Sequence, residues 1–491
     1  VQRPPMPKPD ITRVDEATAH LALADARRDL EGYRYGQGTL IQHAARQRCA
    51  QGATGLPHAR FRCLGQAAGG QCMTTYRVYE YSVLSVSGQE ALDAAMHAVS
   101  QPLAAARAAV DATLTAVCRA LCLAVLATPL IVADTYYPYV VGKALYSRML
   151  IELAVGCWLL LALRSRTHWL RPSWALAALA AYVAVAAAAA IGGVSITRSL
   201  WSTYERMGGV IDLAHWAAYA VVVAAMFRHA RHWRIMFIAQ LAVSTVVAAW
   251  GTAEFGMHGG RIVSTLGNPV YVGGLMAMAA TLALALAAES RRRLPVALCT
   301  MTFGLCLWAL ILSGTRAGLL ALLVGVSIVG LAHIRGRRMV PVLAYGIMGL
   351  LVIAAVASPR LGLSDGISGR LHAYQAGLAA WAERPVLGYG PDAFVVAFDG
   401  HAPDGAELAR GESFDRAHSA PVEALVTTGI VGLAAWGNLW ATTGLALWRR
   451  RAVVGMAMGA AYLAFSLSQF DTAATMPVVA LVWAMAIGER A

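Results

Sequence analysis

The sequence is poor in charged residues, which make up only 14% of its 491 positions. A soluble globular chain carries roughly a quarter of such residues. Hydrophobic residues account for 58% of the chain, and the mean hydropathy is +0.55. These values exclude an ordinary soluble domain and predict an all-α, polytopic integral membrane protein.

Acidic residues are fewer than basic ones: the chain has 27 aspartates and glutamates and 40 lysines and arginines, for a formal net charge of +13. A basic balance can indicate nucleic-acid binding. Here, however, the arginines lie in short clusters between apolar runs, a pattern typical of topology control and contact with anionic lipid. We therefore expect membrane lipid as a partner and no nucleic acid.

The eight cysteines contain no C-x-x-C pair. Five of them lie within apolar runs, where a free thiol behaves as a small hydrophobic side chain. Cys49, Cys63 and Cys72 lie in the polar N-terminal segment, and their spacing fits no zinc pattern. We interpret these three as free thiols or as partners in a loop disulfide, and we predict no metal site and no cofactor.

Composition divides the chain into two parts. Residues 1–110 are polar and arginine-rich, and we predict a separate N-terminal segment whose role the sequence does not define. Residues 111–491 consist mainly of apolar runs near the ~20 residues that cross a ~30 Å bilayer core. They predict a transmembrane domain of about 12 helices. The predicted spans are Ala112–Asp134, Tyr139–Leu163, Ser173–Gly192, Val210–Phe227, Ile235–Gly251, Pro269–Ala288, Leu294–Leu312, Ala317–Ile334, Val340–Ala357, Pro421–Trp448, Ala452–Ser466 and Leu467–Ile487.

Arginine clusters occupy alternate connections between these spans. Short loops rich in Lys and Arg stay in the cytoplasm, so both termini and these connections are predicted inside and the other loops outside. The arginine-rich connections are Arg164–Arg171, Arg228–Arg234, Glu289–Arg293, His333–Arg338 and Arg449–Arg451.

Single arginines nevertheless occur in the outer loops, close to predicted spans. An isolated cation near the bilayer is costly and tends to mark function, and guanidinium groups pair well with phosphate oxygens. Convergent arginines at this face therefore suggest a lipid-linked phosphate or diphosphate. The strongest candidates are Arg261 and Arg316, followed by Arg198, Arg206 and Arg370. A solvated or headgroup-bound charge is the commoner interpretation, which we apply to Arg360, Arg384, Arg410 and Arg416.

A loop of about 60 residues, 358–420, precedes the tenth span, and structureless loops of that length are uncommon unless they are functional. Leu371, Tyr374, Leu378 and Trp381 are spaced by three and four residues. This spacing predicts an amphipathic helix at the membrane interface, with Arg370 in its first turn.

His418 stands at the entry to the tenth span, with Ser419 at a cap position and Pro421 in the first turn. An interfacial histidine that makes a structural hydrogen bond is the simpler interpretation. The alternative is a general base that activates an acceptor hydroxyl and is oriented by Asp415 or Glu423.

Several segments resemble one family of bacterial membrane enzymes. The stretch HSAPVEALVTTGIVG, from His418 to Gly432, resembles the His-[Asn/Ser/Gln]-x9-Gly-x-x-Gly signature of O-antigen ligases, and ERPVLGYGPDAF resembles their P-x-x-G-x-G segment in the same loop. SLWSTYERMGGVI, RIVSTLGNPVYVGG and LSGTRAGLLAL are also similar to parts of this superfamily, which includes O-antigen polymerases and protein O-oligosaccharyltransferases. The resemblance covers about residues 112–487.

The resemblance implies a metal-independent glycosyltransferase in the bacterial inner membrane, consistent with the lack of a D-x-D motif in the outer loops. It would move a glycan from undecaprenyl diphosphate to lipid A-core on the periplasmic face, where loop 358–420 would lie. On this basis His418 deprotonates or orients the acceptor hydroxyl, and Arg261 and Arg316 hold the diphosphate. The predicted substrate-binding residues are Arg198, Arg206, Arg370, Asn268, Tyr389 and Asp415.

Other functions remain open at this point. Polymerisation of O-antigen or glycosylation of a protein would share the donor and differ in the acceptor. A transporter of lipid-linked sugar, from another class, also suits twelve spans. Against it, the spans hold few acids, mainly Glu152 and Asp212, and show no clear inverted repeat.

Overall fold

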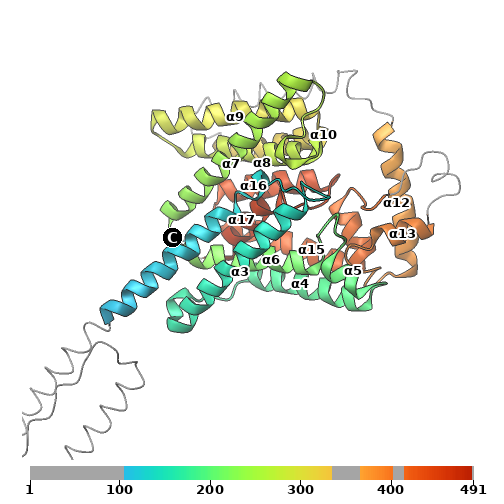
Figure 1. The fold of residues 1–491 in the computed structure, drawn as a ribbon, viewed down its shortest axis with the longest axis horizontal. Helices are drawn as coiled ribbons and strands as arrows, with labels where there is room; N and C mark the ends of the chain where they lie inside the picture. The colour runs from blue at the N-terminus through green and yellow to red at the C-terminus, as the bar shows by residue number, and fades with distance from the viewer. Residues whose placement is uncertain (1–103, 334–364, 402–413, 489–491) are drawn as a thin grey trace, which may run out of the picture. The chain divides into compact units, whose positions relative to one another are not determined.

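The computed structural model describes residues 104–333, 365–401 and 414–488 (Figure 1). Within these ranges, eight helices are long and apolar enough to cross a membrane, and three shorter helices are also apolar. The chain is therefore a polytopic, all-helical membrane protein. The long helices are Ala104–Val125, α3 (Val141–Arg164), α4 (Trp174–Gly192), α7 (Ala230–His258), α8 (Pro269–Glu289), α9 (Arg293–Ser313), α10 (Arg316–His333) and α15 (Ala420–Arg449). The shorter apolar helices are α6 (Val210–Met226), α16 (Val453–Ser466) and α17 (Met476–Ile487). The remaining described elements are α5 (Ile196–Trp201), α12 (Asp365–Glu383), α13 (Phe394–His401) and the 3₁₀ turns η2 (Thr128–Leu130), η3 (Arg166–His168) and η4 (Ser264–Leu266).

Most predicted spans coincide with a helix, but the first and the last of the twelve differ, because the last helix begins at Met476 and not at Leu467. The first was placed at 112–134, whereas the helix ends at Val125 and a 3₁₀ turn with Pro129 follows. The last two helices, α16 and α17, contain only 14 and 12 residues, fewer than the ~20 of a full span. The ninth predicted span, Val340–Ala357, lies outside the described residues.

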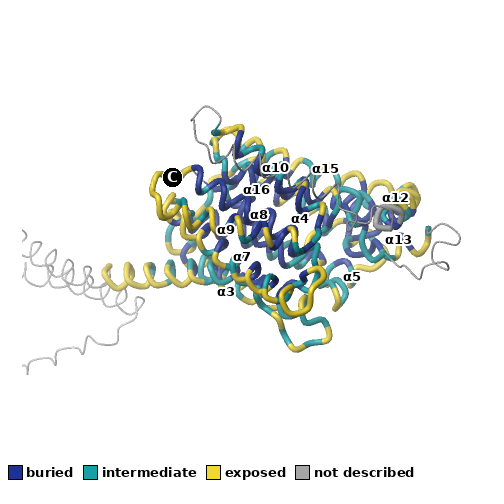
Figure 2. Tube along the Cα trace, turned by 90° about the horizontal axis from the view of Figure 1, so that it is seen from above, coloured by how far each residue is buried: buried dark blue, intermediate teal, exposed yellow. Residues whose placement is uncertain are grey.

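Helix α8 forms the centre of one half of the bundle, where it packs against α7, α9, α10 and α16. Its small residues allow this close approach: a side-chain carbon added to Gly273 or Gly274 would overlap Thr315 or Phe465. The other half consists of α3, α4, α6, α15 and α17. Buried positions are concentrated in the middle of the bundle (Figure 2).

The helices alternate in direction, so that α3, α6, α8, α15 and α17 begin at one end of the bundle. Helices α12 and α13 lie at this same end in both views (Figures 1 and 2). We call it the α12 end. The connections α3–α4, α6–α7, α8–α9 and α15–α16, which carry arginine clusters, lie at the opposite end by the same alternation.

Candidate functional site

Helix α15 is broken at Gly429, whose backbone has φ +68° and ψ −171°. This conformation is essentially restricted to glycine. The break removes helical hydrogen bonds on both of its sides, and the segment 385–390 replaces them. Tyr389 and Gly390 donate their amides to the carbonyls of Val426 (3.0 Å) and Thr427 (2.8 Å), while Ile430 and Val431 donate theirs to Pro385 (2.9 Å) and Val386 (3.4 Å).

The break joins the two motifs that the sequence resemblance singled out. A side-chain carbon on Gly429 would overlap the carbonyl of Val386, and one on Gly388, whose φ is also +68°, would overlap the backbone of Val426 and Thr427. The P-x-x-G-x-G segment and the histidine signature are therefore one interlocked unit. This unit fixes the first part of α15, at whose start His418 lies.

A cavity of about 160 Å³ lies within the bundle at the α12 end. It is enclosed by the first turns of α3, α6, α8, α15 and α17 and by the later part of α4. Its polar and aromatic lining includes Lys143, Tyr182, Arg206, Tyr271, Asp392, Arg416, Glu423, Phe470 and Asp471.

Arg416 is held between two carboxylates at this cavity. Its guanidinium forms ion pairs with Asp392 and, at 3.1 Å, with Glu423, and its side chain is only 11% exposed. Burial opposes the charge, but Glu423, Asp392 and Asp415 together outweigh it and raise the pKa of Arg416. The prediction of a solvated Arg416 was therefore wrong, and this side chain is a buried link between the α13 segment and α15.

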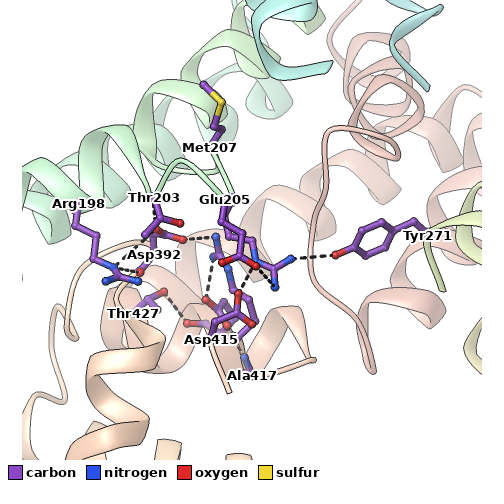
Figure 3. Close-up of polar contacts among 12 residues, drawn as sticks. Arg198, Thr203, Glu205, Met207, Tyr271, Asp392, Asp415, Ala417 and Thr427 are labelled. Carbon is purple, nitrogen blue, oxygen red and sulfur yellow. Dashed lines mark hydrogen bonds and ion pairs between the residues drawn. The ribbon is translucent and has the colours of Figure 1, made fainter. Parts of the chain in front are cut away.

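Asp392 also anchors the loop that follows α5 (Figure 3). Arg198 donates to its carbonyl oxygen at 2.7 Å, and the amide of Thr203 donates to its carboxylate at 3.1 Å. Asp392 is 3% exposed and has a positive φ of 61°. A strained, buried carboxylate with several donors indicates a position that the surrounding structure over-determines.

Arg206 lies in the same loop and is bonded to Asp415, with Tyr271 approaching its guanidinium from the start of α8 at 3.3 Å (Figure 3). The ring centroid of Phe470 lies 5.6 Å from the guanidinium carbon. Burial lowers the pKa of Arg206, but Tyr271 and Asp415 outweigh it, so the pKa is raised and the group is protonated.

His418 stands beside this group. Its ring contacts Phe470 at a centroid distance of 5.3 Å and Phe414 at 6.0 Å. Gln469 supplies the side-chain hydrogen bond that the sequence argument assigned to Asp415 or Glu423. Burial lowers the pKa of His418, and Arg370 and Arg206 act in the same direction against Asp415 and Gln469. The imidazole is therefore neutral near neutral pH and able to accept a proton.

Arg261 and Arg316 lie at a neighbouring corner of the α12 end and do not line the cavity, as far as the described residues define it. Arg261 donates to the carbonyl of Ser313 at 2.8 Å, and Arg316 is exposed at the start of α10. Thr315 donates to the carbonyl of Pro269 at 3.0 Å. This bond connects the corner to the start of α8 and so to Tyr271.

Two other predicted residues have structural partners, and a third lies near His418. Asn268 caps α8 by accepting from the amide of Val270 at 2.8 Å. Tyr389 is 6% exposed and donates to Glu383 at 3.1 Å. Arg370 is near His418, but it is the sixth residue of α12 and not in the first turn, because the helix begins at Asp365.

The predicted amphipathic helix is present as α12. Ala373, Ala376 and Ala380 are buried, whereas Leu371 and Leu378 are 53% and 48% exposed. The two leucines thus face away from the protein, as expected of a helix at a membrane interface, whereas Trp381 packs against the buried cluster.

Sequence reasoning missed three residues that contact Arg206 or His418. Tyr271, Phe470 and Gln469 were assigned no role, and the last two were placed within the predicted span Leu467–Ile487. In the structure they lie in the connection between α16 and α17. The polar residues Gln469 and Asp471, within an otherwise apolar stretch, were the available signal.

The fold and the site define a multi-pass membrane protein with a charged, arginine-containing cavity beside a neutral histidine at one end of its bundle. Residues 301–437 match the family described as O-antigen ligase. This segment, which contains Arg316, Asp392, His418 and Gly429, is similar to the O-antigen ligase domain family, whose members transfer lipid-linked glycans. No curated protein matches the chain.

Proposed function

We propose that the chain transfers a glycan from undecaprenyl diphosphate to lipid A-core at the periplasmic face of the bacterial inner membrane, without a metal ion. The observation that carries the proposal is a continuous series of contacts at the α12 end. His418 packs on Phe470, Phe470 packs on Tyr271 at a centroid distance of 6.1 Å, and Tyr271 lies in the first turn of α8. The bond from Thr315 to Pro269 connects that turn to the start of α10.

The start of α10 supports binding of the donor diphosphate. The first amides of an 18-residue helix carry partial positive charge, and Arg316 adds a full charge there. Arg261 bonds a neutral carbonyl, so its charge is not cancelled by that contact. Arg206 and Arg416 are paired with carboxylates. In this mechanism Arg261 and Arg316 hold the leaving diphosphate, and Arg206 faces it from the cavity.

The acceptor hydroxyl binds at His418. The neutral imidazole takes the hydroxyl proton, or orients the hydroxyl, as the oxygen attacks the anomeric carbon. The bond from that carbon to the diphosphate breaks, and the arginines stabilise the negative charge that develops. Gln469 and the two flanking phenylalanine rings fix the imidazole orientation.

The test is transfer by purified protein with an undecaprenyl-diphosphate glycan, lipid A-core and a chelator. We expect product from the unmodified chain and a loss of about 10²–10⁴-fold for His418→Ala, the range of general-base catalysis. His229→Ala, an exposed histidine at the opposite end of the bundle, is the matched control and should retain activity. Near-normal transfer by His418→Ala would remove His418 from the mechanism, and product on a protein or glycan acceptor alone would replace the ligase assignment.

A further inference from the structure

Two loops at the α12 end present tyrosines that the mechanism does not use. Tyr136 and Tyr137 lie in the turn before α3, and Tyr204 lies in the loop between α5 and α6. The rings of Tyr136 and Tyr137 meet edge to face with centroids 4.9 Å apart. The rings of Tyr137 and Tyr204, more than sixty residues apart in sequence, meet in the same way with centroids 5.9 Å apart. Tyr136 is 84% exposed and Tyr204 is 56% exposed. We call these three residues the tyrosine platform.

The platform is continuous with the proposed donor site on both sides. Tyr204 is two residues before Arg206. Tyr139, which follows Tyr137 in the same turn, lines the cavity and packs so closely over Gly267 that a side-chain carbon there would overlap its ring. Gly267 directly precedes Asn268, the cap of α8. The platform therefore connects the Arg206 loop with the turn before α3, whose Tyr139 contacts the segment that leads into α8.

Both loops are held rigidly. Thr203 is bonded to Asp392 and accepts from the amide of Met207 at 2.8 Å, while the turn before α3 is closed by the amide of Ala133 donating to Pro138 at 3.1 Å. Ser202 and Met207, on either side of Tyr204, have positive φ values of 68° and 49°. Rings kept exposed by strained, anchored loops are pre-organised for a ligand.

An aromatic belt at the membrane interface is the alternative for exposed tyrosines. Belt residues contact lipid one by one, whereas these rings join two distant loops and adjoin a charged cavity. Glu205, which follows Tyr204 in the chain, is 50% exposed, and its carboxylate lies 3.7 Å from the guanidinium of Arg206. Electron-rich ring faces that can contact sugar C–H groups, beside a carboxylate that can accept from hydroxyls, suit a pyranose.

We infer that the tyrosine platform binds the glycan of the lipid-linked donor, at the sugars next to the diphosphate. This inference rests on the proposed function, and it deepens it by assigning a sugar subsite to one substrate. The donor is favoured over the acceptor because the platform adjoins Arg206 and the start of α8, whereas His418 is flanked by Phe414 and Phe470.

The test compares direct binding of undecaprenyl diphosphate with and without its glycan, for protein in lipid nanodiscs. Tyr136→Ala and Tyr204→Ala should each weaken binding of the glycan-bearing lipid by about tenfold, the scale of one lost aromatic contact. Binding of the glycan-free lipid should not change, and Tyr204→Phe should bind as the unmodified chain does. Trp174→Ala, an 82% exposed aromatic residue at the opposite end, is the control for a belt residue.

Transfer kinetics complete the test. The alanine variants should raise the KM for the donor and leave the KM for lipid A-core unchanged. A rise in the acceptor KM alone, equal loss of binding for both lipids, or no change would overturn the inference. The binding measurement does not depend on transfer. If the protein binds the glycan through the platform but forms no ligated product, the proposed function is contradicted and the inference about the platform stands.

Discussion

The substitution Gly429→Ala tests the interlock between α15 and the segment 385–390. Alanine at φ +68° and ψ −171° occupies a region that costs about 1–3 kcal/mol. Its side-chain carbon would also overlap the carbonyl of Val386. Relief of that overlap requires the segment to move and breaks backbone hydrogen bonds worth about 1 kcal/mol each. With two or three of the four bonds lost, the total is about 3–6 kcal/mol.

The same movement displaces the start of α15 relative to the cavity, and with it His418. A misplacement of about 1 Å can reduce a rate by about 10²-fold. We therefore expect Gly429→Ala to lower the melting temperature of the detergent-solubilised protein and to reduce glycan transfer by at least about 10²-fold. Fluorescence-detected size exclusion after heating measures the first effect, and the transfer assay measures the second.

Gly437→Ala is the matched control, since Gly437 lies in the same helix with open space where its side-chain carbon would be. Alanine is favoured over glycine in a helix by about 1 kcal/mol, so this variant should be as stable as the unmodified chain or more so. Unchanged stability and activity in Gly429→Ala would refute the interlock.

Three further changes separate catalytic from structural roles. Burial lowers the pKa of His418 below that of a free imidazole, so the base stays unprotonated at neutral pH. We therefore expect kcat/KM to be constant near neutral pH and to fall only at a pH below the pKa of a free imidazole. A fall in kcat/KM that begins above the pKa of a free imidazole would contradict this reasoning. Arg416→Met leaves the buried Glu423 without its cation and Asp392 with only Arg198, 3.8 Å away, and should cost about 3–5 kcal/mol, measured as a large fall in melting temperature. Arg384→Met, at an exposed position, should change little. Asn268→Ala removes the cap of α8 and should cost about 1 kcal/mol with the donor KM unchanged; a large rise in KM would instead show substrate contact.

The spans could be predicted from the sequence because the length of an apolar run is a local property. The predicted Pro269–Ala288 matches α8 to within one residue. The predicted span 112–134 was wrong at its end. Residues 126–133 are mostly apolar, so hydropathy extends the span through them. Pro129, however, has no amide hydrogen to donate to a helical hydrogen bond, and it disfavours a helical conformation in the residue before it.

The break at Gly429 could not be predicted in the same way. Its glycine was visible in the signature, and close helix packing was the expected reason. The actual reason is the backbone of Val386, more than forty residues earlier in the chain, which crosses α15 at that point.

The charges of the site show the same limit. His418 could be proposed from the sequence because its signature is contiguous. Arg384 and Arg416 are both single arginines of one loop and look alike in sequence, yet one is exposed and the other is buried between two acids. Only the folded chain brings Asp392 and Glu423 to Arg416.

The most direct measurement of the central claim is a cryo-electron microscopy map of the protein in nanodiscs with bound undecaprenyl-diphosphate glycan. The account predicts diphosphate density within hydrogen-bond distance of Arg261 and Arg316, with the first sugar leading toward His418. Density for the diphosphate at the opposite end of the bundle, or at the α12 end without contact to either arginine, would contradict it.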